Sequence, residues 1–221
     1  MENDKMKTRK RIFIAINLPD KTKEELLRYQ SFWSDLPAHW TKKENLHITL
    51  SFLGYLADAE LPDVLAVTER IAAKTESFSV ALDKICYGPK DKKPPRPRTK
   101  QEKEDLQQDY GHGNRYGVGA RMIWAVGENP KLGKLQRELE RSLLFSGNEK
   151  TVNTDENRTY TAHITLARIR QWEFRRIDPE AIPIIDNDIS LSFSVNSIEI
   201  MESILKKGGP QYIALESYPL G

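Results

Sequence analysis

The sequence is poor in the residues that build crosslinks and metal clusters. Its 221 residues include one cysteine, Cys86, and four histidines. A single cysteine excludes an intramolecular disulfide and a thiolate zinc cluster, and it favours a reducing cytoplasm. No HExxH, paired CxxC or EF-hand pattern occurs, so the sequence predicts no metal site. A GxxxxGK[ST] phosphate loop is absent as well, and nothing indicates ATP or another cofactor.

Long apolar runs and a strong net charge are also missing. The apolar run at 11–18 is too short to span a bilayer or to act as a signal peptide. The formal net charge is only +2, with 38% hydrophobic and 30% charged residues, a composition typical of soluble globular proteins. We therefore expect a cytoplasmic monomer that uses neither a membrane nor an obligate protein partner.

What the chain does contain is an internal repeat, at 11–87 and 121–204. Each copy has the pattern strand, helix, strand with the tetrapeptide HITL, helix, strand. The residue patterns predict strands at 11–18, 45–54, 78–85, 122–127, 160–169, 189–195, 197–201 and 211–217, and helices at 21–33, 61–73, 129–144 and 171–180. A Lys-Lys-Gly-Gly-Pro turn predicts a hairpin over 204–215. The sequence thus predicts one α+β domain over 1–221, a bilobal pseudo-two-fold repeat. Each lobe is an antiparallel β-sheet with helices on its outer face, and the active-site cleft lies between the lobes.

The segment between the two copies differs in composition. Residues 89–115 hold four prolines, eight Lys or Arg and five Asp or Glu, with few apolar residues. We expect a long basic loop there. It is either a solvated linker or an electrostatic arm for RNA phosphates.

Each HITL tetrapeptide predicts a histidine and a threonine on one strand face. Residues two apart in a strand point the same way, so His47 pairs with Thr49 and His163 with Thr165. An imidazole transfers protons near neutral pH, and a hydroxyl can bond a phosphate oxygen. Two such units facing each other supply a general acid and a general base for metal-free hydrolysis of a cyclic phosphodiester. Packing requires only the isoleucine and leucine, so the repeated histidine favours catalysis.

Other residues near these tetrapeptides have weaker patterns. His39 lies in a turn-like PAHW stretch and His112 between glycines of the insertion, and we expect both to be exposed and without a function. Trp40 and Tyr160 could each stack a terminal base or anchor the core or a loop, and the sequence leaves that choice open.

Longer segments resemble a known family. They are RIFIAINLP near the start, WTKKENLHITLSFLG at 40–54, AHITLARIR at 162–170 and GGPQYIALESYPL at the end. In this order they resemble the two-histidine phosphoesterase superfamily, and within it the RNA 2',3'-cyclic phosphodiesterase branch, also called 2'-5' RNA ligase. The resemblance covers nearly the whole chain. It departs at Ala162, where the family usually has proline, and in the length of the insertion.

The resemblance implies opening of a 2',3'-cyclic phosphate at an RNA 3' end to a phosphomonoester, the 2'-phosphate. It implies His47 as the general acid, His163 as the general base, and Thr49 and Thr165 as phosphate-binding hydroxyls. The family's arginine, five residues after the second histidine, falls on Arg168. Strict alternation points Arg168 away from His163, so it reaches the site only if the strand ends, twists or bulges there.

Three other functions stay open at this point. The same histidines could join RNA ends through a 2'-5' linkage, because that reaction is the reverse chemistry. The substrate could be a small nucleotide, although the basic insertion favours RNA. The fold could also serve as a non-catalytic RNA-binding module, which the presence of both histidines and both threonines disfavours.

Overall fold

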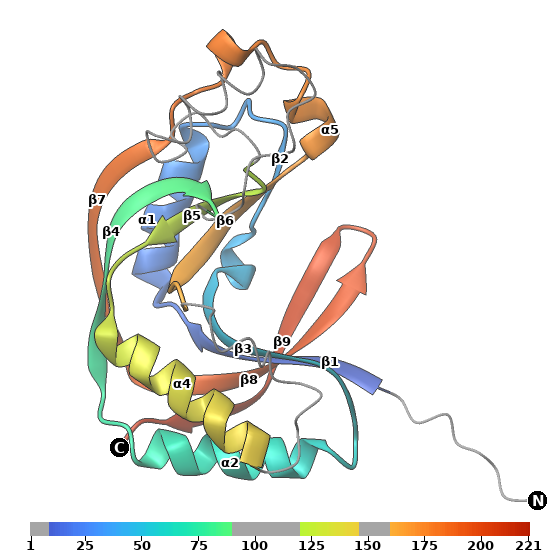
Figure 1. Ribbon diagram of the computed structural model, residues 1–221, viewed down its shortest axis with the longest axis vertical. Coiled ribbons are helices and arrows are strands. Elements are labelled where there is room, and N and C mark those ends of the chain that lie inside the picture. The colour runs from blue at the N-terminus through green and yellow to red at the C-terminus, as the bar shows by residue number, and fades with distance from the viewer. Residues whose placement is uncertain (1–8, 90–119, 146–159) are drawn as a thin grey trace, which may run out of the picture.

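In the part of the chain that the structure describes, residues 9–89, 120–145 and 160–221, nine strands join one antiparallel sheet (Figure 1). The structure is a computed structural model. The strand order is β7-β4-β5-β6-β3-β1-β8-β9, and β2 also pairs with β6. The strands are β1 (Arg9–Asn17), β2 (Ala38–Trp40), β3 (His47–Ala57), β4 (Phe78–Gly88), β5 (Met122–Val126), β6 (His163–Ile169), β7 (Asp186–Val195), β8 (Ser197–Lys206) and β9 (Gly209–Pro219).

The helices cover the sheet with their apolar faces. They are α1 (Asp20–Ser31), α2 (Leu61–Ala73), α4 (Pro130–Phe145) and α5 (Gln171–Phe174), with short 3₁₀ turns η1 (Lys43–Asn45) and η2 (Pro179–Ala181). In α4 the buried leucines recur at helical spacing, at 132, 135, 139 and 143, because residues three and four apart share one face. They join the main core together with the isoleucines of β1.

The two HITL strands adjoin at the middle of the sheet. Four strands, β7, β4, β5 and β6, lie on one side of this junction, and β3, β1, β8 and β9 lie on the other. Each group draws on both copies of the repeat, because β4 pairs with β5 and β7 while β8 pairs with β1. The helices cross over too: α1 contacts β6 and β7, whereas α4 contacts β3 and α2. The strands on each side of the β3–β6 junction therefore come from both copies of the repeat and not from one continuous half of the chain.

The α+β class, the antiparallel sheet and most of the expected elements are confirmed. The expected hairpin is formed by β8 and β9, which pair from Lys206 and Gly209 onward. One difference is the helix expected at 171–180, which is only the four-residue α5 followed by η2. Pro179 disfavours helical backbone at Asp178, so a helix could not run unbroken to 180; it does not account for the end at Phe174. The other difference is β2, whose three residues are too few for a periodic pattern.

Some expectations lie outside the described residues. These concern almost all of the basic insertion at 89–115, which includes His112. No helix in the described part of the chain is long and apolar enough to cross a membrane.

Candidate active site

The junction of β3 and β6 brings the two HITL tetrapeptides side by side. Ile48 lies opposite Ile164 in the antiparallel pairing, and both isoleucines are fully buried in the main core. Because side chains alternate across a strand, the histidine and threonine on either side of each isoleucine point to the other face of the sheet. All four are partly exposed. The sequence-predicted catalytic and phosphate-binding residues thus share one face.

Both histidine rings are held by the same backbone contact. The Nδ1–H of His47 donates to the carbonyl of Asn45 at 2.7 Å, and the Nδ1–H of His163 donates to the carbonyl of Thr161 at 2.8 Å. Since a carbonyl only accepts, the proton of the neutral ring lies on Nδ1 in each case. This leaves Nε2 as the nitrogen that can exchange a proton with a substrate. In His47 this Nε2 accepts from the hydroxyl of Thr49 at 2.9 Å.

His47 is neutral in the free protein. Its ring is only partly exposed, and the loss of hydration that the imidazolium suffers there lowers the pKa of His47 from 6.5 to about 4. The hydrogen bond to Asn45 opposes this effect, and the positive charges of His163 and Arg168 add to it. That the charges of His163 and Arg168 affect the pKa of His47 is consistent with the three side chains lying close together.

Aromatic rings contact both histidines. The ring of His163 stacks on Trp124 of β5, with centroids 4.0 Å apart. The ring of His47 contacts Phe13 of β1 and Tyr212 of β9, each with centroids 5.1 Å apart. The β8–β9 hairpin rises on the side of the sheet away from α2 and α4 (Figure 1), and its Tyr212 contacts His47. These contacts restrict the tilt of both imidazoles.

A β-bulge directs Arg168 to the site face. Thr165 lies opposite Trp124, but Ala167 lies opposite the next residue, Ile123, so Leu166 is one residue too many in β6. The extra residue reverses the alternation after Thr165. Leu166 and Ala167 are both buried, and Arg168 is exposed on the face of His163. The sequence predicted that Arg168 reaches the site only if the strand ends, twists or bulges there, and β6 does have a bulge at Leu166.

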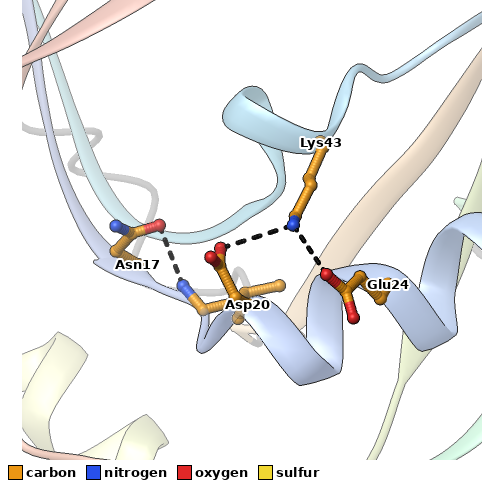
Figure 2. A network of polar contacts seen from close by, with 5 residues as sticks. Asn17, Asp20, Glu24 and Lys43 are labelled. Atoms are coloured by element: carbon orange, nitrogen blue, oxygen red, sulfur yellow. Dashed lines mark hydrogen bonds and ion pairs between the residues drawn. The ribbon is translucent and has the colours of Figure 1, made fainter.

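The segment before His47 is fixed by polar contacts. Figure 2 shows the ammonium of Lys43, in η1, between two carboxylates of α1, at 3.0 Å from Glu24 and 3.8 Å from Asp20. Buried Asn45 donates from Nδ2 to the carbonyl of Pro210 at 2.8 Å, which ties η1 to the β8–β9 hairpin. The segment that carries the Asn45 carbonyl, which orients His47, is therefore held by contacts to α1 and to the β8–β9 hairpin.

The structure decides the open question for Tyr160 and Trp40. The Tyr160 hydroxyl donates to the carbonyl of Thr49 at 2.8 Å, so this side chain links the start of β6 to β3. Burial raises the pKa of Tyr160. Trp40 lies opposite Ala167 and packs against the main core. Both are anchors in the free protein. His39 is exposed, as expected, and lies opposite Arg168.

Sequence reasoning missed the aromatic partners Phe13, Trp124 and Tyr212. Each stands in a strand-like run where an aromatic residue is ordinary, and only strand pairing brings it to a histidine. A family-wide alignment could have marked them; spacing within one chain could not. Within the described ranges, no group of three or more His, Cys, Asp or Glu is arranged to hold a metal ion.

Known proteins of one family resemble this chain. The model of the LigT like phosphoesterase family matches residues 16–99. The RNA 2',3'-cyclic phosphodiesterase of Methanocaldococcus jannaschii is 23% identical over 94% of this chain and 99% of its own. The enzyme of the same name from Thermus thermophilus is 29% identical over 95% and 90%, respectively.

Solved structures share the fold. The crystal structure of TT0787 from Thermus thermophilus superposes with a TM-score of 0.70, at 24% identity over 95% of this chain and 97% of that one. E. coli LigT complexed with 3'-AMP gives a TM-score of 0.68, at 20% identity over 96% and 99%. The partial family match, the relatives along nearly the whole chain and the shared fold agree in one respect: this chain is similar to the LigT-like phosphoesterases.

Proposed function

We propose that this protein hydrolyses 2',3'-cyclic phosphate ends of RNA to 2'-phosphomonoesters, with His47 and His163 as the acid–base pair. One observation carries the proposal: two histidines on one sheet face each donate from Nδ1 to a backbone carbonyl two residues earlier. This arrangement prepares two Nε2 atoms for proton transfer, as metal-free phosphodiester hydrolysis requires.

The proposed step is a displacement at phosphorus. A water oxygen attacks the phosphorus atom and loses its proton to the Nε2 of the neutral histidine. The bond from phosphorus to the ribose 3' oxygen breaks, and that oxygen receives a proton from the Nε2 of the protonated histidine. The ring opens, the 2' oxygen keeps the phosphate, and the second proton of water is lost to solvent. Protons and charge balance without a metal ion.

Three further side chains are proposed to bind the phosphate. The hydroxyls of Thr49 and Thr165 and the guanidinium of Arg168 lie on the face of the two histidines. Hydrogen-bond donors in place before the reaction stabilise the charge that develops on the phosphoryl oxygens. Because the β6 bulge turns Arg168 to this face, its fixed positive charge is available to an anionic substrate.

The order of the two roles follows the family resemblance, with His47 as the acid and His163 as the base. Loss of hydration leaves His47 unprotonated in the free protein. The acid role therefore requires that the bound phosphate raise the pKa of His47, which a neighbouring anion does.

RNA is the proposed substrate because relatives along nearly the whole chain bear the name RNA 2',3'-cyclic phosphodiesterase. Action as a cytoplasmic monomer without a cofactor belongs to the same proposal. The single cysteine of the chain, Cys86, is buried, which is compatible with a reducing compartment.

The test uses a short RNA that ends in a 2',3'-cyclic phosphate, with EDTA present. The wild-type protein should release a 2'-phosphomonoester. His47→Ala and His163→Ala should each slow the reaction by roughly 10²–10⁴-fold, the usual contribution of a general acid or base. Separation of the products on a gel or column identifies the 2' or 3' position of the phosphate.

Arg70→Gln serves as the control, since Arg70 is an exposed residue of α2, a helix that packs on the core face of the sheet and not on the face of the histidines. It should retain full activity, and circular dichroism should report the same fold for every variant. An intact cyclic end with folded wild-type protein would contradict the hydrolase. Loss of the cyclic end with formation of a longer 2'-5'-linked RNA would instead identify a ligase.

A further inference from the structure

An exposed row of side chains extends the site face of β1 and β3 beyond the histidines. We name it the β1–β3 strip, and it consists of Arg9, Arg11 and Tyr55. It begins next to Phe52, an exposed residue whose ring lies 6.1 Å from that of Phe13. Phe13 in turn contacts His47 at 5.1 Å between centroids. The strip is thus continuous with the candidate active site.

A second bulge in β3 determines which way Tyr55 points. Phe52 lies opposite Phe13, but Gly54 lies opposite the next residue, Ile12, so Leu53 is an extra residue. Leu53 is buried in the core, and Gly54 has a φ of +73°, a backbone conformation that favours glycine. Without this bulge, alternation would turn Tyr55 into the core. With it, Tyr55 lies opposite Arg11 on the face of Phe13.

The strip combines an exposed aromatic ring with two exposed positive charges. Tyr55 is 64% exposed, although tyrosine usually covers part of its ring in a folded protein. Arg9 and Arg11 are exposed, and among the described residues no carboxylate lies within ion-pair distance of either guanidinium. Lys10 points to the opposite face and pairs with Asp58 at 3.4 Å. The charges on the strip are therefore available to a ligand.

We propose that the β1–β3 strip binds the RNA nucleotides on the 5' side of the reacting end. Single-stranded RNA is bound by aromatic rings that stack on bases and by cations that contact phosphates. Rows of a strand two residues apart are separated by about 7 Å. The Arg11–Tyr55 row is therefore one such step beyond the Phe13–Phe52 row, which touches His47 through Phe13. A chain whose last phosphate lies between the histidines would place its preceding nucleotides on the strip.

The inference rests on the proposed function, and substrate length tests it. The substrates are a nucleoside 2',3'-cyclic phosphate and a trinucleotide with the same cyclic end, compared by kcat/KM. Wild-type protein should prefer the trinucleotide. Tyr55→Ala should lower that preference by about 5- to 150-fold, which is the energy of one stacked base converted to a ratio. Turnover of the mononucleotide should not change, because the strip lies outside the reacting centre.

Two further variants separate stacking from charge. Tyr55→Phe keeps the aromatic face and should keep the trinucleotide preference. Arg11→Gln should weaken trinucleotide binding and lower the slope of log Kd against log salt concentration by about 0.7, the value for one contact to single-stranded phosphate. Phe32→Ala, which removes another exposed ring (66% exposed) at the end of α1, is the matched control and should change neither quantity.

Binding of a labelled trinucleotide with a 2'-phosphate provides a readout that does not depend on turnover. If the wild type binds it more tightly than the mononucleotide and Tyr55→Ala removes the difference, the strip stands even if no substrate is hydrolysed. In that case the proposed hydrolase function would be wrong, while RNA binding by the β1–β3 strip would still hold. Equal binding of both lengths by the wild type overturns the strip, as does a length preference that survives Tyr55→Ala and Arg11→Gln. A change in oligomeric state with unaltered RNA binding also overturns it, in favour of a protein interface.

Discussion

At the scale of single residues, His47 and His163 have the same backbone contact but different surroundings. His47 lies between Phe13 and Tyr212 at the base of the β8–β9 hairpin, and His163 lies flat on Trp124. The edge contact of Tyr212 with His47 and the stacked contact of Trp124 with His163 leave different parts of the two imidazole rings accessible to a ligand. The two matching tetrapeptides are therefore not equivalent sites, and the asymmetry of a reaction with one acid and one base can originate here.

The protonation of His47 provides a prediction at this scale. Its pKa is about 4 in the free protein, mainly because the imidazolium loses hydration there. A bound phosphate anion favours the charged imidazolium, so a nucleoside 2'-monophosphate should raise this pKa by about one to three pH units. A nuclear magnetic resonance titration of the histidine rings measures both values, and the resonance lost in His47→Gln gives the assignment. A pKa that stays near 4 with ligand bound would contradict the acid role of His47.

At the scale of elements, irregular strands decide what the site contains. Bulges at Leu166 and Leu53 turn Arg168 and Tyr55 to the site face. A third register shift, at Leu50, lies one residue after Thr49, just as Leu166 lies one residue after Thr165. It turns Phe52, five residues after His47, to the position that Arg168 has after His163. The repeat therefore conserves the bulge while the residue that it presents differs, an aromatic ring on one strand and a cation on the other.

The contact between η1 and the β8–β9 hairpin provides a prediction at this scale. Asn45 donates to the carbonyl of Pro210 from a buried position, and Tyr212, two residues on, packs against His47. Asn45→Ala leaves that carbonyl without its donor, so it should lower the free energy of unfolding by about 1–3 kcal/mol. If His47 is the acid as proposed, Asn45→Ala should also lower kcat/KM by about tenfold or more, because a reacting ring displaced by about 1 Å can lose that much rate.

Hydrogen exchange of the hairpin amides and urea unfolding measure the two effects of Asn45→Ala. Asn45→Asp keeps the size of the side chain but replaces the donor with a carboxylate that repels the Pro210 carbonyl, so it should weaken the hairpin contact at least as much as Asn45→Ala. Both variants keep the backbone carbonyl that orients His47. Unchanged protection of the hairpin in both proteins would mean that this hydrogen bond does not hold Tyr212 in place.

At the scale of the whole molecule, the distance between the two histidines depends on one narrow junction. β3 and β6 share a single residue pair, Ile48 with Ile164, and the Tyr160 hydroxyl bond crosses beside it. The other neighbouring strands of the sheet are joined by several pairs each. The site therefore lies where the two groups of strands are least extensively connected by their backbones, and buried side chains carry much of the connection.

The junction can be tested by removing part of one buried side chain. Ile48→Ala should lower the free energy of unfolding by about 2–5 kcal/mol, because Ile48 is fully buried and the change leaves a cavity. Ile48→Val should cost about 0.5–1.5 kcal/mol. Leu205→Ala, at a position 83% exposed on the hairpin, should stay within about 0.5 kcal/mol. Urea unfolding compares the three, and an Ile48→Ala protein as stable as the Leu205→Ala protein would contradict this account of the junction.

The sequence by itself determined the local structure and the two HITL units. Leucines at helical spacing in α4 and alternating isoleucines in β1 specify their elements, because each pattern matches one backbone period. The repeat of a histidine and a threonine two residues apart was visible without any structure, since alternation alone puts them on one face. The family resemblance rests on those same local segments.

Only the tertiary structure decided which of these faces meet and what surrounds them. Arg168 and Tyr55 reach the site face through bulges, which depend on how neighbouring strands fit and leave no mark in the alternation of a single strand. Pairing of β1 with β3 brings Phe13 to His47, and pairing of β5 with β6 brings Trp124 to His163. Tyr212 reaches His47 because β8, the partner of β9, pairs with β1. Such contacts follow from pairing between residues far apart in the chain, which local patterns do not encode.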